Sequence, residues 1–105
     1  MSFNQRVQFL GHVQSVQAAA LSWNPGSVGA GATVSTTVSV PGTTLGDLVD
    51  VTAGATMGNL ALTAEATDNA GTVTIRIHNV TAGALAAPNT TYFVTVYKFD
   101  PKIFV

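Results

Sequence analysis

The sequence contains no cysteine and very little charge. The absence of cysteine excludes a disulfide scaffold, thiol catalysis and a cysteine-ligated zinc site. Charged residues make up 9% of the 105 residues, against about 25% in an average soluble protein. The formal net charge is −1, so the chain lacks the positive surface that nucleic acids and anionic membranes attract. We therefore expect no nucleic-acid partner and no membrane partner.

Long hydrophobic runs and a leader pattern are also missing. No run of about 18 apolar residues exists, which argues against a membrane-spanning helix. The first residues lack the basic start and the unbroken apolar stretch of a signal peptide, and Gln14 and Gln17 interrupt the only candidate region. We expect the chain to function without secretion by the general route. With 47% apolar residues, one ordered domain with its own core is expected.

Residue patterns for chemistry are scarce. The two histidines, His12 and His78, have no neighbouring nucleophile motif. The acidic residues are too sparse for a calcium loop, and Asp47 and Asp68 are better explained as turn residues whose carboxylates accept backbone N–H bonds. Asn79-Val80-Thr81 matches the glycosylation pattern, which we interpret as accidental. We predict no catalytic residues, no cofactor and no metal, and hence no enzyme.

What is present is strand periodicity. Alternating, β-branched segments separated by turn residues predict strands, because branched side chains pack well on a pleated surface. They occupy residues 33–40, 47–52, 60–66, 72–78 and 91–99. The segments 60–66 and 72–78 flank an Asp-Asn-Ala-Gly turn and predict a hairpin, with Val73, Ile75 and Ile77 facing inward.

The segment 91–99 is apolar or aromatic on both faces. Alternation places Tyr92, Val94 and Val96 on one face, and Phe93, Thr95, Tyr97 and Phe99 on the other. A strand of this kind is covered on both sides, either within its own core or by a subunit neighbour. Both possibilities stay open for Phe93, Tyr97 and Phe99.

The chain divides into a glutamine-containing arm, residues 1–16, and a body, residues 17–105. We predict a strand over 17–23 and an extended arm before it, with a short helix within 4–16 as the alternative. Several short strands at regular spacing, with few helix signals, predict an all-β fold: an antiparallel β-sandwich, Ig-like or jelly-roll-like, with a short N-terminal arm.

Two stretches carry a family resemblance. Residues 41–47 read PGTTLGD and residues 72–83 read TVTIRIHNVTAG. In their order along residues 18–98 they resemble the small β-sandwich modules of tailed-bacteriophage virion proteins, which occur as capsid decoration or cement proteins, head fibres and tail-fibre tips. The resemblance implies an oligomeric module without catalytic residues. Because this module forms nearly the whole chain and no fibre shaft is present, the resemblance is best to a decoration protein.

This resemblance implies a capsid decoration protein that is made in the host cytoplasm and binds the mature head on the outer surface of the virion. Its implied partners are copies of itself, as a homotrimer, and the major capsid protein. The residues expected at oligomer or capsid interfaces are Phe3, Phe9, Leu10, Val13, Phe93, Tyr97 and Phe99. The alternative is a fibre-tip module that binds host glycans, for which Trp23 and Tyr97 are the aromatic candidates.

Overall fold

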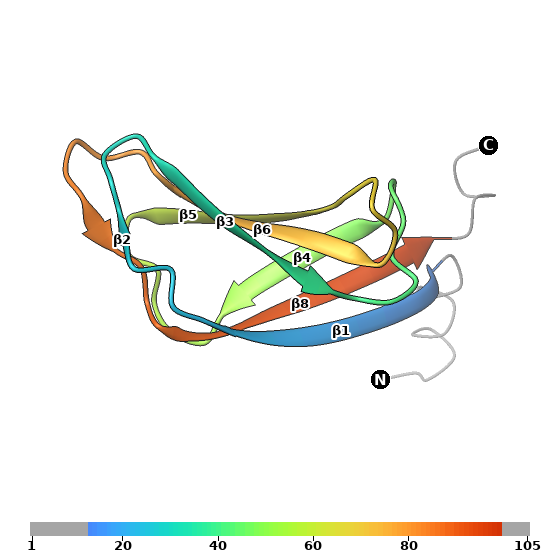
Figure 1. The fold of residues 1–105 in the computed structure, drawn as a ribbon. Coiled ribbons are helices and arrows are strands. Elements are labelled where there is room, and N and C mark those ends of the chain that lie inside the picture. The colour runs from blue at the N-terminus through green and yellow to red at the C-terminus, as the bar shows by residue number, and fades with distance from the viewer. Residues whose placement is uncertain (1–12, 100–105) are drawn as a thin grey trace, which may run out of the picture.

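Eight β-strands make up the regular structure of residues 13–99, the part of the chain that the computed structural model describes (Figure 1). They are β1 (Val13–Trp23), β2 (Ser27–Val28), β3 (Thr33–Ser39), β4 (Leu48–Ala53), β5 (Leu60–Ala66), β6 (Thr72–Asn79), β7 (Leu85–Ala86) and β8 (Thr90–Phe99). No helix occurs within residues 13–99, so none there is long and apolar enough to cross a membrane. The predicted all-β class is confirmed.

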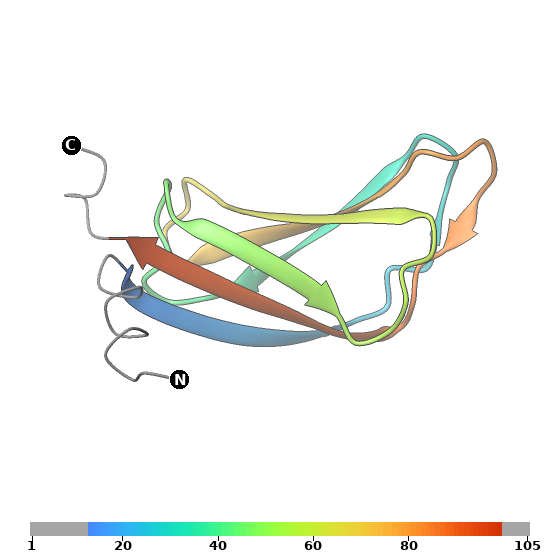
Figure 2. The ribbon, with the colours of Figure 1, turned by 180° about the vertical axis from the view of Figure 1, so that it is seen from behind.

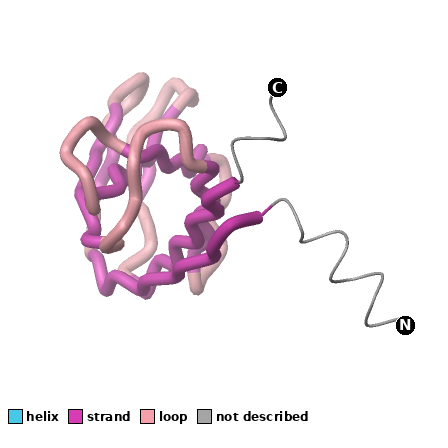
Figure 3. Tube along the Cα trace, turned by 90° about the vertical axis from the view of Figure 1, so that its right-hand side faces the viewer, coloured by secondary structure: helices cyan, strands magenta, loops and turns pink. Residues whose placement is uncertain are grey.

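Two three-stranded antiparallel sheets pack face to face. One has the order β1-β8-β4 and the other β3-β6-β5, so β8 and β6 are the central strands. The strands β4 and β5 contact each other along one side, where the chain passes between the sheets (Figures 1 and 2). Seen end-on in Figure 3, the sheets lie on opposite sides of one interior. This is the antiparallel sandwich that the sequence predicts.

The core lies between the two central strands. Val73, Ile75 and Ile77 on β6 are fully buried, as predicted. Tyr92, Val94 and Val96 on β8 face them and are also buried. Strict alternation on both strands is what places these side chains in one layer, because successive side chains of a strand point to opposite faces. The remaining core members are Val28, Val38, Val40, Leu60 and Ala87.

The predicted hairpin is present as β5–β6, with Leu60 opposite Asn79 and Ala66 opposite Val73. Its turn uses Gly71 at φ 81°, a conformation that glycine adopts without steric cost. The predicted role of Asp68 is wrong: no described hydrogen bond involves its carboxylate. Instead the Asn69 N–H donates to the Thr67 hydroxyl at 3.1 Å.

Most predicted strands differ from the structure by at most one residue at an end, and two differences are larger. Strand β1 begins at Val13, four residues before the predicted strand 17–23 and inside the predicted arm. It extends this far because β8 offers partners up to Phe99, with a bulge between Val13 and Ser15. The second difference is that β2 and β7 pair as a two-residue ladder within segments predicted as loops. Two-residue strands carry no periodicity that a sequence could reveal.

Candidate functional site

The outer face of the β1-β8-β4 sheet carries exposed apolar side chains. Residues that lie directly opposite each other on neighbouring strands share a face. The register therefore gives three outward rows: Val16–Tyr97–Leu48, Ala18–Thr95–Asp50 and Ala20–Phe93–Thr52. Leu48 is 53% exposed, Val16 52% and Phe93 46%. We call these nine residues the apolar face.

The outer face of the other sheet is polar. Its rows are Thr33–His78–Ala61, Ser35–Arg76–Thr63 and Thr37–Thr74–Glu65. Arg76 forms an ion pair with Glu65, and the His78 ring nitrogen Nδ1 shares a hydrogen bond with the Thr33 hydroxyl. Both sheets thus contribute buried side chains to the core, but their outer faces differ in chemistry.

An ion pair lies at one end of the same sheet, on the inner side that alternation gives to Tyr92, Val94 and Val96. The Lys98 ammonium lies 2.9 Å from Asp47 Oδ2 and donates a further hydrogen bond to the Thr44 hydroxyl at 2.9 Å. Asp47 Oδ2 also accepts the Thr44 backbone N–H at 3.0 Å, so the predicted turn role of Asp47 is confirmed. Asp50 is the one charged side chain among the nine residues of the apolar face.

The structure places the predicted interface residues as follows. Phe93 and Tyr97 lie on the outer side of β8 and not in the core. Phe99 lies half-buried at the end of the same strand, opposite the backbone of Val13. Phe3, Phe9 and Leu10 lie outside the described residues.

Sequence reasoning did not select Val16 and Leu48. Both flank Tyr97 in one row of the apolar face. Leu48 alternates with Asp50 and Thr52, so its side of β4 reads as a polar side. Only the pairing with Tyr97 shows that Leu48 extends an apolar row.

The two aromatic residues considered for sugar binding do not form one platform. Trp23 belongs to the inner row of β1 and packs edge-on against Tyr92, with ring centroids 5.4 Å apart and an interplanar angle of 60°. Tyr97 points to the opposite side of the same sheet. Their separation by a sheet layer removes the shared stacking surface that a sugar ring would need.

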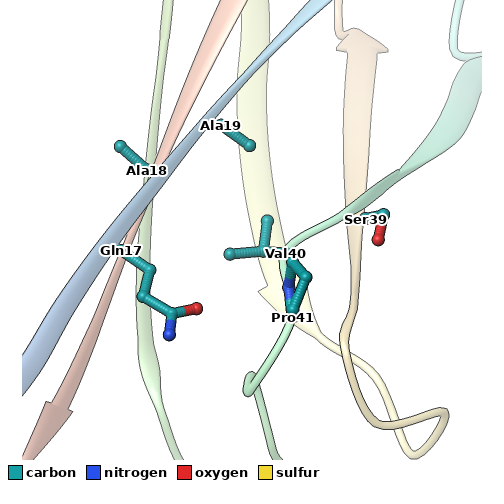
Figure 4. A pocket seen from close by; sticks show the side chains of 6 residues that line it. All are labelled: Gln17, Ala18, Ala19, Ser39, Val40 and Pro41. Carbon is teal, nitrogen blue, oxygen red and sulfur yellow. The ribbon is translucent and has the colours of Figure 1, made fainter.

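A shallow groove lies where the edge strand β1 faces the end of β3. It measures about 370 Å³ and is lined by Gln17, Ala18, Ala19, Ser39, Val40 and Pro41 (Figure 4). These residues include no titratable or nucleophilic pair. Within residues 13–99, no group of three or more histidine, aspartate or glutamate side chains could hold a metal ion.

Asn79, the acceptor of the Asn-Val-Thr pattern, is a structural residue. Its side chain is 0% exposed, and its Nδ2 donates to the carbonyls of Val28 and Gly83, each at 2.9 Å. Its Oδ1 accepts the Thr81 N–H at 2.9 Å and the Thr81 hydroxyl at 2.7 Å. A glycan has no access to an amide that is buried and fully hydrogen-bonded, and the Asn79 side chain instead joins β2 to the connection between β6 and β7.

Comparison of the chain with protein-family models, with curated proteins and with solved structures finds no match.

Proposed function

We propose that this protein is a non-enzymatic structural subunit of a virion, a capsid decoration protein that binds the mature head and stabilises it. The observation that carries the proposal is the difference between the two sheet surfaces. One exposes Val16, Leu48 and Phe93 beside two alanines and Tyr97, and the other exposes mainly Thr and Ser with an ion pair. Contiguous exposed apolar patches mark interaction sites.

The apolar face supplies the binding energy in this proposal. Covering a half-exposed Val, Leu or Phe side chain contributes about 1 kcal/mol, at roughly 25 cal/mol per Å² of apolar area. Val16, Leu48 and Phe93 each have about half of their surface available. The resemblance to virion modules assigns the partners: further copies of the chain, as a homotrimer, and the major capsid protein. Contacts made only in the mature shell stabilise that shell by mass action.

A fibre-tip function is less well supported. Glycan recognition needs aromatic side chains on exposed loops, and the long connection between β6 and β8 contains none. The aromatic residues lie instead on the outer face of a sheet or in the core. An open sheet face suits another protein surface better than a small sugar ring, which binds in a concave site.

The test mixes the purified protein with mature capsids and, separately, with host cells, and sediments each mixture. We expect stoichiometric sedimentation with capsids and none with cells. Phe93→Lys places a charge in the apolar face and should reduce capsid binding at least about tenfold, since burying an unpaired charge is costly. The matched control, Thr37→Lys, places the same charge on the polar sheet and should bind like wild type. Binding to cells and not to capsids would favour the fibre-tip function.

Mass photometry tests the oligomer independently. We expect a trimer that Phe93→Lys disrupts and Thr37→Lys preserves. A wild-type monomer at micromolar concentration would contradict self-association through the apolar face.

A further inference from the structure

The connection between β3 and β4 consists of two consecutive turns with the same backbone pattern. Residues 40–43 and residues 44–47 each form a hydrogen bond of 3.2 Å from the N–H of the fourth residue to the carbonyl of the first. The third residue of each turn is a glycine with positive φ, Gly42 at 91° and Gly46 at 93°. A positive φ at this position is typical of a type II turn, which favours proline at its second position.

The two turns differ at that second position. Pro41 occupies it in the first turn and Leu45 in the second. Leucine does not fix φ as proline does. The Leu45 side chain is 64% exposed and belongs neither to the core nor to the side chains packed against it. The fold therefore does not account for a leucine at the second position of this turn.

Side-chain hydrogen bonds hold the Leu45 turn, residues 44–47, in place. The Thr44 N–H donates to Asp47 Oδ2 at 3.0 Å. The Lys98 ammonium donates to the Thr44 hydroxyl and to Asp47 Oδ2, each at 2.9 Å, which ties the turn to the end of β8. A pre-organised turn loses less conformational entropy on binding than a free loop would. Leu45 is thus presented to solvent from a fixed position.

The groove beside β1 has the size and chemistry to accept this side chain. Four of its six lining residues are apolar: Ala18, Ala19, Val40 and Pro41 (Figure 4). Its volume is about 370 Å³, and a cavity of about 150 Å³ is enough to hold benzene. No lining residue is charged. Because Asp47 and Lys98 neutralise each other, the Leu45 turn brings no unpaired charge to the groove.

Hydrogen-bonding groups on the two surfaces are also complementary. The side-chain amide of Gln17, which lines the groove, forms no hydrogen bond within residues 13–99. The peptide group between Leu45 and Gly46 forms none within the same residues. A glutamine amide carries both donors and an acceptor. It can therefore donate to the Leu45 carbonyl or accept from the Gly46 N–H.

We propose that the Leu45 turn of one copy of the chain inserts into the β1 groove of a second copy. The inference rests on the proposed function for self-association and adds which residues meet. Each copy carries both the turn and the groove, so a head-to-tail contact repeated around a ring can close a homotrimer. Ala18 lines the groove and belongs to the apolar face, so the two contact surfaces are continuous.

Leu45→Ser tests the inserted side chain. Val80 is 71% exposed in the loop after β6, so Val80→Ser removes a similarly exposed apolar side chain and is the matched control. In a mass-photometry dilution series, Leu45→Ser should raise the dissociation constant for self-association at least about tenfold. Val80→Ser should leave it at the wild-type value. Both variants should keep the wild-type Tm, because neither side chain belongs to the core.

Cysteine variants test which surfaces meet, because the natural chain has no cysteine to interfere. Leu45→Cys and Gln17→Cys are purified separately, mixed and oxidised; cysteine keeps a small apolar side chain on the turn. A disulfide should link position 45 of one copy to position 17 of the other, seen by mass and on a non-reducing gel. In the control, Leu45→Cys is mixed with Ser35→Cys, whose position lies on the outer face of the polar sheet. This mixture should form no linked product above background.

The outcomes separate this contact from the proposed function. Wild-type self-association in Leu45→Ser, or an equal loss in Val80→Ser, overturns the contact and leaves the proposed trimer standing. Equal linkage of position 45 to positions 17 and 35, or no linkage to position 17, overturns it as well. A monomeric wild type overturns the contact and self-association together, and sedimentation with capsids then tests the remainder of the proposed function.

Discussion

The Tyr92 hydroxyl donates a hydrogen bond to the carbonyl of Pro88, four residues earlier, at 2.8 Å. This bond ties the loop before β8 to the start of the central strand, an arrangement like the tyrosine corner of Greek-key sandwiches. Tyr92→Phe removes the donor and leaves a carbonyl without its partner, which should lower the free energy of unfolding by about 1–2 kcal/mol. Urea unfolding measures the change. Tyr97→Phe, on the outer face, is the control and should stay within about 0.5 kcal/mol of wild type.

The same residue predicts a loss of stability at alkaline pH. Burial raises the pKa of the Tyr92 hydroxyl above its ordinary value of 10.0. As the pH passes about 10, the unfolded chain releases this proton and the folded chain keeps it, so the free energy of unfolding falls. The contribution is complete below that pH. The stability difference between wild type and Tyr92→Phe should therefore narrow from pH 8 to pH 11, and a constant or growing difference would contradict the assignment.

Removing the charge of Asp47 should destabilise the fold less than removing its whole carboxylate, because the carboxylate also accepts a hydrogen bond in the turn. Asp47→Asn removes the charge and keeps an oxygen for the Thr44 N–H, which should cost about 0.5–1 kcal/mol. Asp47→Ala removes both interactions and should cost about 1–2 kcal/mol. The loss from Asp47→Asn should shrink in 1 M salt, whose Debye length is about 3 Å. Equal losses from both variants would show that the turn bond contributes nothing.

Substitution of Asn79 should lower the free energy of unfolding more than substitution at most other positions outside the apolar core. Asn79→Ala removes the side-chain partner of the Val28 carbonyl and of the Thr81 N–H, and leaves the Gly83 carbonyl with the Thr81 hydroxyl, for a loss of about 3 kcal/mol or more. Asn89→Ala, in an exposed loop, is the control and should change stability by less than about 0.5 kcal/mol. If Asn79→Ala does not fold, Asn79→Ser, which keeps one donor and one acceptor, should fold with reduced stability. Equal stability of Asn79→Ala and Asn89→Ala would contradict the buried network.

Replacing Gly54 with a larger residue should destabilise the fold, because neighbouring atoms occupy the space that a Cβ would fill. Its N–H donates to the Thr91 carbonyl at 2.8 Å, and an added Cβ would lie 3.0 Å from that carbonyl oxygen and 2.8 Å from the Thr90 hydroxyl. Gly54→Ala should lower the unfolding free energy by about 1–3 kcal/mol, as overpacking does. Gly83→Ala meets no atom within 4 Å and serves as the control. Thermal unfolding of both variants checks the contrast, and a tolerated Gly54→Ala would show that β8 moves freely there.

The central strands were predictable from the sequence because their local pattern and their final environment agree. Val73, Ile75 and Ile77 alternate with polar residues and end in the core. The pattern of 91–99 correctly separated Tyr92 and Phe93 onto opposite faces, but it left open which face is inside, and the structure buries the face of Tyr92. A period of two residues sorts side chains into two faces, and an inward face is identified only where the other face is polar.

The apolar face was only partly predictable, because it depends on register between distant strands. Val16 and Leu48 become neighbours of Tyr97 through two separate pairings. The Asp47 turn bond is local and was predicted, whereas its partner Lys98 lies 51 residues away. Sequence patterns report which face of a strand a residue occupies and do not report which strand lies beside it.

The pairing of β1 with β8 also determines the order in which the chain can fold. These strands are the first and last that the structure describes, and they form ten paired positions. During synthesis the β5–β6 hairpin can form as soon as residue 79 is available, but β1 has no partner until the last strand has left the ribosome. Long-range pairing of this kind slows folding, and an edge left unpaired meanwhile is prone to aggregate. A chain made in many copies would therefore depend on fast release of its C-terminal strand.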